Sequence, residues 1–183
     1  MLSRCASACA IALAAAFSAH AELDVESFAR SLPERANGVF TERKTLCDVD
    51  VTLVSSGRWS FVKDVCFELE TLKPVKSAFK ATMDGYSTTV RGVTTETKFG
   101  DVAMSEPLAA LCRGDLSAAE KLFRIDEIKG GFRLKPIDGD MASIVKRVEV
   151  LGGGEDAFTS RVQTVRFLYA NGDTIEIVLS AAK

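Results

Sequence analysis

Apolar and polar residues alternate along most of the chain after residue 33, and this period of two predicts β-strands. Turn signals separate the alternating runs at a spacing of about 8–12 residues, so we expect about nine to eleven short antiparallel strands. Such a pattern favours a barrel or a sandwich over a parallel α/β fold, because no helix follows each strand. Strands are expected within residues 37–46, 47–74, 77–100 (two or three strands), 122–128, 130–137, 143–151, 160–169 and 173–180.

Two segments depart from this alternation. Residues 22–32 place leucine and phenylalanine near helical spacing, and Pro33 ends the run. Residues 105–122 begin with Ser105, a suitable N-cap, and are interrupted at Gly114 before a second run of helical character. The sequence therefore predicts a helical pair in the middle of a series of strands.

The segment CDVDVTLVSSGRWSFVKDVC, residues 47–66, is typical of a hairpin that turns at Ser55-Ser56-Gly57. A three-residue loop gathers large apolar residues on one face, which predicts an apolar wall. The facing pairs would be Leu53 with Trp59 and Val51 with Phe61.

A register shifted by one residue would instead place Cys47 opposite Cys66 and allow a disulfide. Burial of each large side chain contributes about 1.5–3 kcal/mol, and one disulfide about 2–4 kcal/mol. The apolar register is therefore favoured, although a bulge between the turn and the cysteines would allow both.

Residues 160–180 form a second hairpin pattern, with a three-residue loop from Ala170 to Gly172. Glycine at the last loop position suits a left-handed backbone conformation. This loop places Phe167 opposite Ile175, so that one face of the hairpin is apolar.

The N-terminal residues 1–21 have the layout of a secretory signal peptide. A single positive charge at Arg4 precedes an apolar run at residues 8–17, and the triplet Ala-His-Ala ends at Ala21. We expect cleavage near Ala21 and export of residues 22–183 as one domain. The exported part would carry 22 basic and 25 acidic residues, since Arg4 is removed from the 23 Lys and Arg, which gives a net charge of −3.

The only histidine, His20, lies in this signal peptide. The exported chain therefore lacks the imidazole of Ser-His and Cys-His nucleophilic sites and of histidine-ligated zinc. A carboxylate pair such as Glu68 and Glu70, or Asp138 and Asp140, is the remaining option for an enzyme, but a solvated strand face and a turn explain these pairs. We expect no catalytic, metal or cofactor site, and no nucleic-acid binding because no basic run is present.

The order of several stretches resembles the family of outer-membrane lipoprotein carriers, the LolA-like proteins. No single motif carries the resemblance; the succession of motifs does. The stretches are FTERK (residues 40–44), SSGRWSFVK (55–63), EPLAALCRGD (106–115), FRLKPIDGDMASIVKRVEV (132–150) and NGD (171–173).

The resemblance implies an unclosed antiparallel β-barrel covered by a helical lid, with an apolar cavity between them. It also implies a monomeric periplasmic carrier in a Gram-negative envelope. Such a carrier takes acyl chains of a lipoprotein or lipid from an inner-membrane exporter to an outer-membrane acceptor. Transfer of an acyl chain into water costs about 0.8 kcal/mol per methylene, so an aqueous compartment needs such a container. The ligand-facing residues implied are Trp59, Phe61, Phe67, Leu69, Phe79, Met83, Leu108 and Leu111.

Two departures from the family pattern are visible. Lys63-Asp64 stands where carriers have Arg-Pro, and lysine lacks the planar fork of the arginine that latches the lid. The chain also ends soon after the NGD turn, which suggests a shorter, divergent relative that serves a lipid exporter. An exported β-domain that binds protein or has a structural role, without lipid, is the alternative.

Overall fold

The computed structural model describes residues 34–63, 65–82, 84–98, 120, 123–129, 131–137, 139–152 and 162–181. The predicted signal peptide, the predicted helix at residues 22–32 and all but Glu120 of the predicted helical pair lie outside these residues. Met83, Leu108 and Leu111 lie outside them as well.

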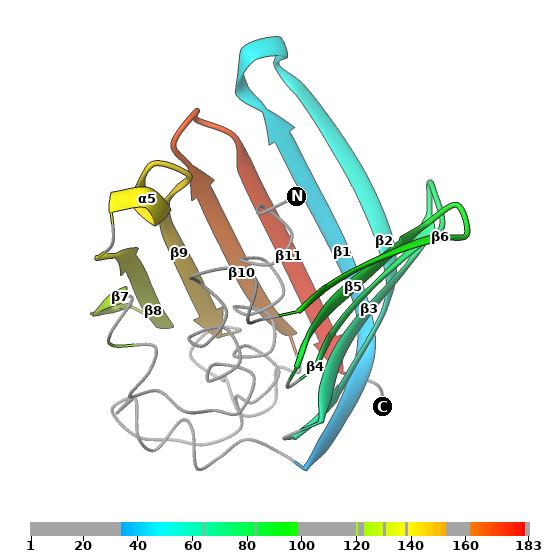
Figure 1. The fold of residues 1–183 in the computed structure, drawn as a ribbon. Coiled ribbons are helices and arrows are strands. Elements are labelled where there is room, and N and C mark those ends of the chain that lie inside the picture. Colours follow the sequence, from blue (N-terminus) through cyan, green and yellow to red (C-terminus); the bar gives the residue numbers. More distant parts are fainter. Residues whose placement is uncertain are drawn as a thin grey trace.

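Eleven strands, a 3₁₀ turn and one short helix make up the described part of the chain (Figure 1). The strands are β1 Arg35–Leu46, β2 Val51–Val62, β3 Cys66–Lys73, β4 Ser77–Thr82, β5 Gly85–Val90, β6 Val93–Lys98, β7 Phe123–Ile128, β8 Gly131–Pro136, β9 Val145–Gly152, β10 Val162–Tyr169 and β11 Thr174–Ala181. The 3₁₀ turn η1 is Cys47–Val49, and the helix α5 is Gly139–Ala142.

All the strands belong to one sheet, in the order β6-β5-β4-β3-β2-β1-β11-β10-β9-β8-β7, and every neighbouring pair is antiparallel. The sheet is strongly curved, and β6 and β7 form its two open edges (Figure 1). The unclosed antiparallel architecture predicted from the sequence is therefore confirmed. The helical lid predicted over it falls on residues that the structure does not describe.

The C-terminal hairpin has the predicted register. Phe167 of β10 lies opposite Ile175 of β11, and Val165 lies opposite Ile177. Gly172 has a φ of 91°, the positive value expected at the end of the loop. The pattern of large β-branched and aromatic residues was sufficient to predict the register here, because only one register puts all of them on one face.

The predicted turn at Ser55-Ser56-Gly57 is wrong. Strand β2 runs through these residues without a break, and the chain turns instead at η1 before it and near Lys63 and Val65 after it. Trp59 consequently faces Leu69 of β3 rather than Leu53. Trp59 and Phe61 are buried as the predicted wall required, but Val51 and Leu53 are exposed.

Gly57 has a different role from the one predicted. The β2–β3 register shifts between Ser56 and Gly57, and a β-carbon placed on Gly57 would come within 2.9 Å of a ring carbon of Phe40 and would overlap the Glu70 carbonyl oxygen. Glycine in a strand marks either a turn or a close approach of other atoms. Here it marks an irregularity of the ladder and a place where an aromatic ring lies against the backbone.

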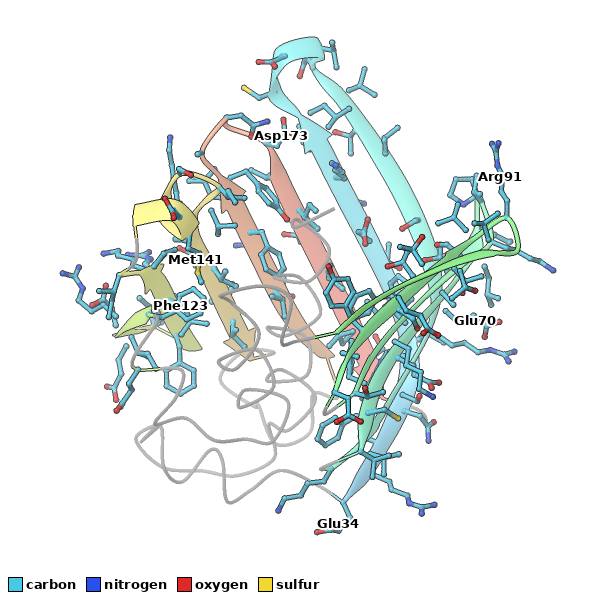
Figure 2. All side chains as sticks on the ribbon, in the orientation of Figure 1. Glu34, Glu70, Arg91, Phe123, Met141 and Asp173 are labelled. Carbon is cyan, nitrogen blue, oxygen red and sulfur yellow. The ribbon has the colours of Figure 1, made fainter. Side chains whose placement is uncertain are left out.

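The unbroken course of β2 also places the two cysteines far apart. Cys47 lies beyond one end of β2, where its amide donates a hydrogen bond to Asp173, and Cys66 pairs with Val62 at the other end. Figure 2 shows Asp173 and Glu34, the residue before β1, at opposite ends of the sheet. The length of β2 is about 35 Å at a strand rise of about 3.3 Å per residue, whereas a disulfide needs α-carbons within about 7 Å. Neither thiol forms a disulfide within the described part of the chain.

One face of the sheet, called the inner face below, carries the apolar core. The ladder registers place every buried apolar strand residue on this face, and Met141 of α5 adds to it. The opposite, outer face carries cross-strand ion pairs such as Lys80–Glu68 at 2.6 Å and Arg166–Glu176 at 2.7 Å. The largest fully buried side chains are Phe67, Phe167, Ile177, Leu179, Val150 and Val165.

Candidate functional site

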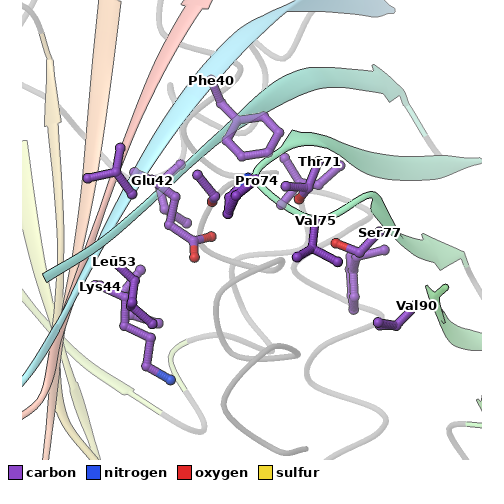
Figure 3. A pocket seen from close by; sticks show the side chains of 15 residues that line it. Phe40, Glu42, Lys44, Leu53, Thr71, Pro74, Val75, Ser77 and Val90 are labelled. Atoms are coloured by element: carbon purple, nitrogen blue, oxygen red, sulfur yellow. The ribbon is translucent and has the colours of Figure 1, made fainter. Parts of the chain in front are cut away.

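A pocket of about 410 Å³ opens at one end of the inner face (Figure 3). Six strands and the β3–β4 turn contribute residues to it. The lining residues are Phe40, Glu42, Lys44, Leu53, Val54, Ser55, Leu69, Thr71, Pro74, Val75, Ser77, Phe79, Val90, Ile175 and Ile177. Its volume falls within the range of about 300–1,000 Å³ typical of small-molecule sites.

The pocket exists because β2 is longer than its neighbour β3. The ladder between them ends at the pair Ser56–Lys73, and the chain then turns into β4. Strand β2 begins at Val51, so its first five residues, 51–55, extend past the β3–β4 turn. Residues of this extension line one side of the pocket, and Pro74 and Val75 of the turn line the other.

The floor of the pocket is apolar and rigidly held. Phe40, Leu69, Phe79, Ile175 and Ile177 are all buried, and each lies in a strand that is paired on both sides. This surface offers no hydrogen-bond partner from its side chains. It is therefore suited to a ligand, or a part of one, that is itself apolar.

The rim is more accessible and carries the only two charged side chains among the lining residues. Glu42 and Lys44 project from alternate positions of β1, and Figure 3 shows both at the pocket. Lys44 lies between Leu53 of β2 and Ile175 of β11 in the ladder. The pocket thus combines an extended apolar floor with a small polar wall.

The residues predicted to face a ligand fall into three groups in the structure. Leu69 and Phe79 line the pocket. Trp59, Phe61 and Phe67 are buried on the same inner face, but they do not line the pocket. The remaining three, Met83, Leu108 and Leu111, lie outside the described residues.

Three residues of the pocket floor, Phe40, Ile175 and Ile177, were absent from the predicted ligand-facing set. The alternation of the segments 37–46 and 173–180 could have indicated them, since both were expected to be strands with one apolar face. The missing information was that β1 and β11 are neighbours in the middle of the sheet.

Lys63, the residue at the family's latch position, lies in the turn between β2 and β3. Its backbone amide donates a 3.0 Å hydrogen bond to the carbonyl oxygen of Glu34. This bond ties the turn to the start of β1. The predicted latch would involve the segment 105–122, which is outside the described part of the chain.

Two hairpin turns meet near the pocket end of the sheet. The Cys47 amide donates a 2.9 Å hydrogen bond to Oδ1 of Asp173, which lies in the β10–β11 turn. This bond, and after it a side-chain hydrogen bond with Asn171, holds the pKa of the Asp173 carboxyl below its ordinary value. At the other end of the sheet, burial and the nearby Glu68 carboxylate raise the pKa of the Cys66 thiol.

Within the described ranges, no group of three or more His, Cys, Asp and Glu side chains is placed to hold a metal ion. None of the helical residues that the structure describes forms a helix long and apolar enough to cross a membrane.

Comparison with known proteins gives similarity at the level of structure only. No family model matches the sequence, and no curated protein is similar to it. A LolA superfamily protein from Nitrosomonas europaea is similar over 80% of this chain and 84% of its own, with 9% identity and a TM-score of 0.41. A domain from Vibrio parahaemolyticus described as an outer membrane lipoprotein-sorting protein is similar over 85% of this chain and 88% of its own, with 8% identity and a TM-score of 0.46.

Proposed function

We propose that the protein is a non-catalytic carrier that holds the acyl chains of a lipid or lipoprotein against the inner face of its sheet. The observation that carries the proposal is the 410 Å³ pocket with a buried floor of phenylalanine, leucine and isoleucine side chains. Each methylene removed from water contributes about 0.8 kcal/mol. A floor of this kind therefore provides the free energy that keeps an acyl chain out of water.

The proposed setting is an exported compartment. The signal-peptide pattern of residues 1–21 directs the chain out of the cytoplasm, with cleavage near Ala21, and the resemblance to lipoprotein carriers points to the periplasm. There, residues 22–183 would act as a monomer between an inner-membrane exporter and an outer-membrane acceptor. A soluble container with an open-edged sheet can load and release its cargo without crossing a membrane itself.

Lipid binding is the decisive test. The exported protein is purified under native conditions, its organic extract is examined by mass spectrometry, and uptake of an uncharged fluorescent acyl probe is measured. We expect co-purified lipid or saturable uptake of the probe. A well-folded protein that shows neither would contradict the carrier function and favour an exported β-domain with a structural or protein-binding role.

A pair of valine substitutions localises the binding. Val90 lines the pocket and is 37% exposed, whereas Val39 lies on the outer face of β1 and is 58% exposed, so a glutamate is tolerated at both positions. Val90→Glu should weaken uptake of the uncharged probe about tenfold, because it replaces an apolar contact worth about 1.5 kcal/mol by a charge. Val39→Glu should leave uptake unchanged, and equal effects of the two variants would place the binding elsewhere.

A further inference from the structure

The charges of the described strands are distributed unequally between the two faces. On the outer face, cations of neighbouring strands pair with carboxylates, as in Lys80–Glu68 at 2.6 Å, Lys135–Asp126 at 2.9 Å and Arg133–Glu149 at 3.0 Å. The two charges of each pair neutralise each other, so these side chains need no ligand to balance them. The inner face at the pocket differs, because there a cation lies beside an apolar surface.

That cation is Lys44. Its side chain is half-buried at the pocket wall, with Leu53 on one side and Ile175 on the other as its ladder neighbours. Among the described residues, no carboxylate lies within ion-pair distance of its ammonium group.

Two carboxylates of the described residues are candidate partners of Lys44, and both have an interaction partner already. Glu42, two positions earlier on the same face, has an interaction partner already. Asp173 accepts the hydrogen bond from the Cys47 amide, and Lys44 acts on it only as a more distant positive charge that helps to lower its pKa. Lys44 is therefore available to an anion that arrives with a ligand.

Given the carrier function proposed above, on which this inference rests, we propose that Lys44 binds the anionic headgroup of the cargo, a carboxylate or a phosphate, at the pocket wall. The acyl chain then lies on the floor formed by Phe40, Leu69, Phe79 and Ile177. Lysine suits either headgroup, because its ammonium is a point charge with three donors rather than a fixed planar fork. The preferred cargo is thus an anionic amphiphile rather than a neutral one.

Ligands that share one chain and differ in headgroup test this assignment. Hexadecanoate, hexadecyl phosphate and uncharged hexadecanol are titrated by calorimetry into the purified exported protein and into the variants Lys44→Gln, Lys44→Arg and Arg43→Gln. Arg43 is the matched control, since it precedes Lys44 on β1, is exposed and points to the outer face.

Lys44→Gln should weaken the binding of at least one anionic ligand about tenfold or more, because a hydrogen bond to a charged group contributes about 1.5–3 kcal/mol. It should leave hexadecanol binding unchanged, Lys44→Arg should retain most of the affinity, and Arg43→Gln should change none of the three. The anion that the wild-type protein binds more tightly identifies the headgroup as carboxylate or phosphate.

Two results would overturn the inference: equal weakening of hexadecanol and the anions in Lys44→Gln, or unchanged binding of both anions. Thermal unfolding of each variant shows whether an affinity loss comes from misfolding, and Lys44→Arg keeps the test valid if Lys44→Gln is unstable. If Lys44→Gln binds both anions and hexadecanol as tightly as the wild type does, the inference fails but the carrier function stands. Wild-type protein that binds none of the three would remove both proposals.

Discussion

Two glycines of the inner face, Gly38 and Gly57, each lie against an aromatic side chain of the neighbouring strand. A β-carbon on Gly38 would come within 2.8 Å of the indole nitrogen of Trp59, and one on Gly57 within 2.9 Å of Phe40. The pairs Gly38–Trp59 and Phe40–Gly57 are directly opposite in the β1–β2 ladder. A missing side chain on one strand thus makes room for a large one on the other, and both rings are buried.

Replacement of Gly57 by alanine should therefore lower the free energy of unfolding by about 1–3 kcal/mol, the usual range for overpacking of a buried site. The added methyl group would meet the Phe40 ring and the carbonyl oxygen of Glu70, which is backbone and cannot rotate away. Urea denaturation followed by circular dichroism measures the change. Gly139→Ala is the control, because a β-carbon there meets no atom within 4 Å. Equal stability of the two variants would show that the close approach at Gly57 does not prevent a side chain there from being accommodated.

At the scale of elements, β2 has two unlike halves. Residues 56–62 lie between β1 and β3, whereas within the described part of the chain residues 51–55 are paired only with β1. This free edge has the sequence VTLVS, without charge or proline, although such residues commonly protect exposed edges. The free half also forms one wall of the pocket, so the unpaired edge borders the pocket.

Amide hydrogen exchange should distinguish the two halves. About half of the amides of residues 51–55 point away from β1 and lack a strand partner, so this segment should take up deuterium faster than residues 57–62. Residues 38–45 of β1, which are paired on both sides, provide the protected reference. Equal protection of the two halves of β2 would mean that another segment covers the free edge in solution.

At the scale of the whole molecule, the sheet consists of two meanders joined in its middle. Strands β1–β6 run to one open edge, β7–β11 run from the other, and the ladder between β1 and β11 connects them. Trp59 of β2 reinforces this joint, since its indole nitrogen crosses β1 and donates a 3.3 Å hydrogen bond to the Ser180 carbonyl oxygen of β11. Gly38, the residue beneath the indole, permits the crossing.

Trp59→Phe should consequently destabilise the whole domain by about 1–3 kcal/mol, through the lost hydrogen bond and the smaller ring. Chemical denaturation followed by far-ultraviolet circular dichroism is the appropriate measurement, because the variant lacks the chain's single tryptophan. Arg58→Gln, an exposed neighbour on the outer face, should change stability by less than about 0.5 kcal/mol. A Trp59→Phe variant as stable as the wild type would show that the indole contact across β1 does not stabilise the domain.

The sequence by itself determined the strand content, the antiparallel class and the C-terminal hairpin. These are local properties: alternation selects strands, and in residues 160–180 a single loop length brings Phe167 and Ile175 to the same face. The apolar character of the pocket was predictable to the same extent, since Leu69 and Phe79 stand at alternating positions of expected strands.

Only the tertiary structure decided what Gly57 does, where the two cysteines lie and which strands meet at the pocket. A glycine in a strand and a glycine in a turn leave the same mark on the sequence, and the difference depends on whether Phe40 of another strand needs the space. In the same way, β1 and β11 are distant along the chain and adjacent in the sheet, so the floor that Phe40 and Ile177 build together has no local signal. Contacts between distant segments follow from packing, and packing is a property of the folded chain as a whole.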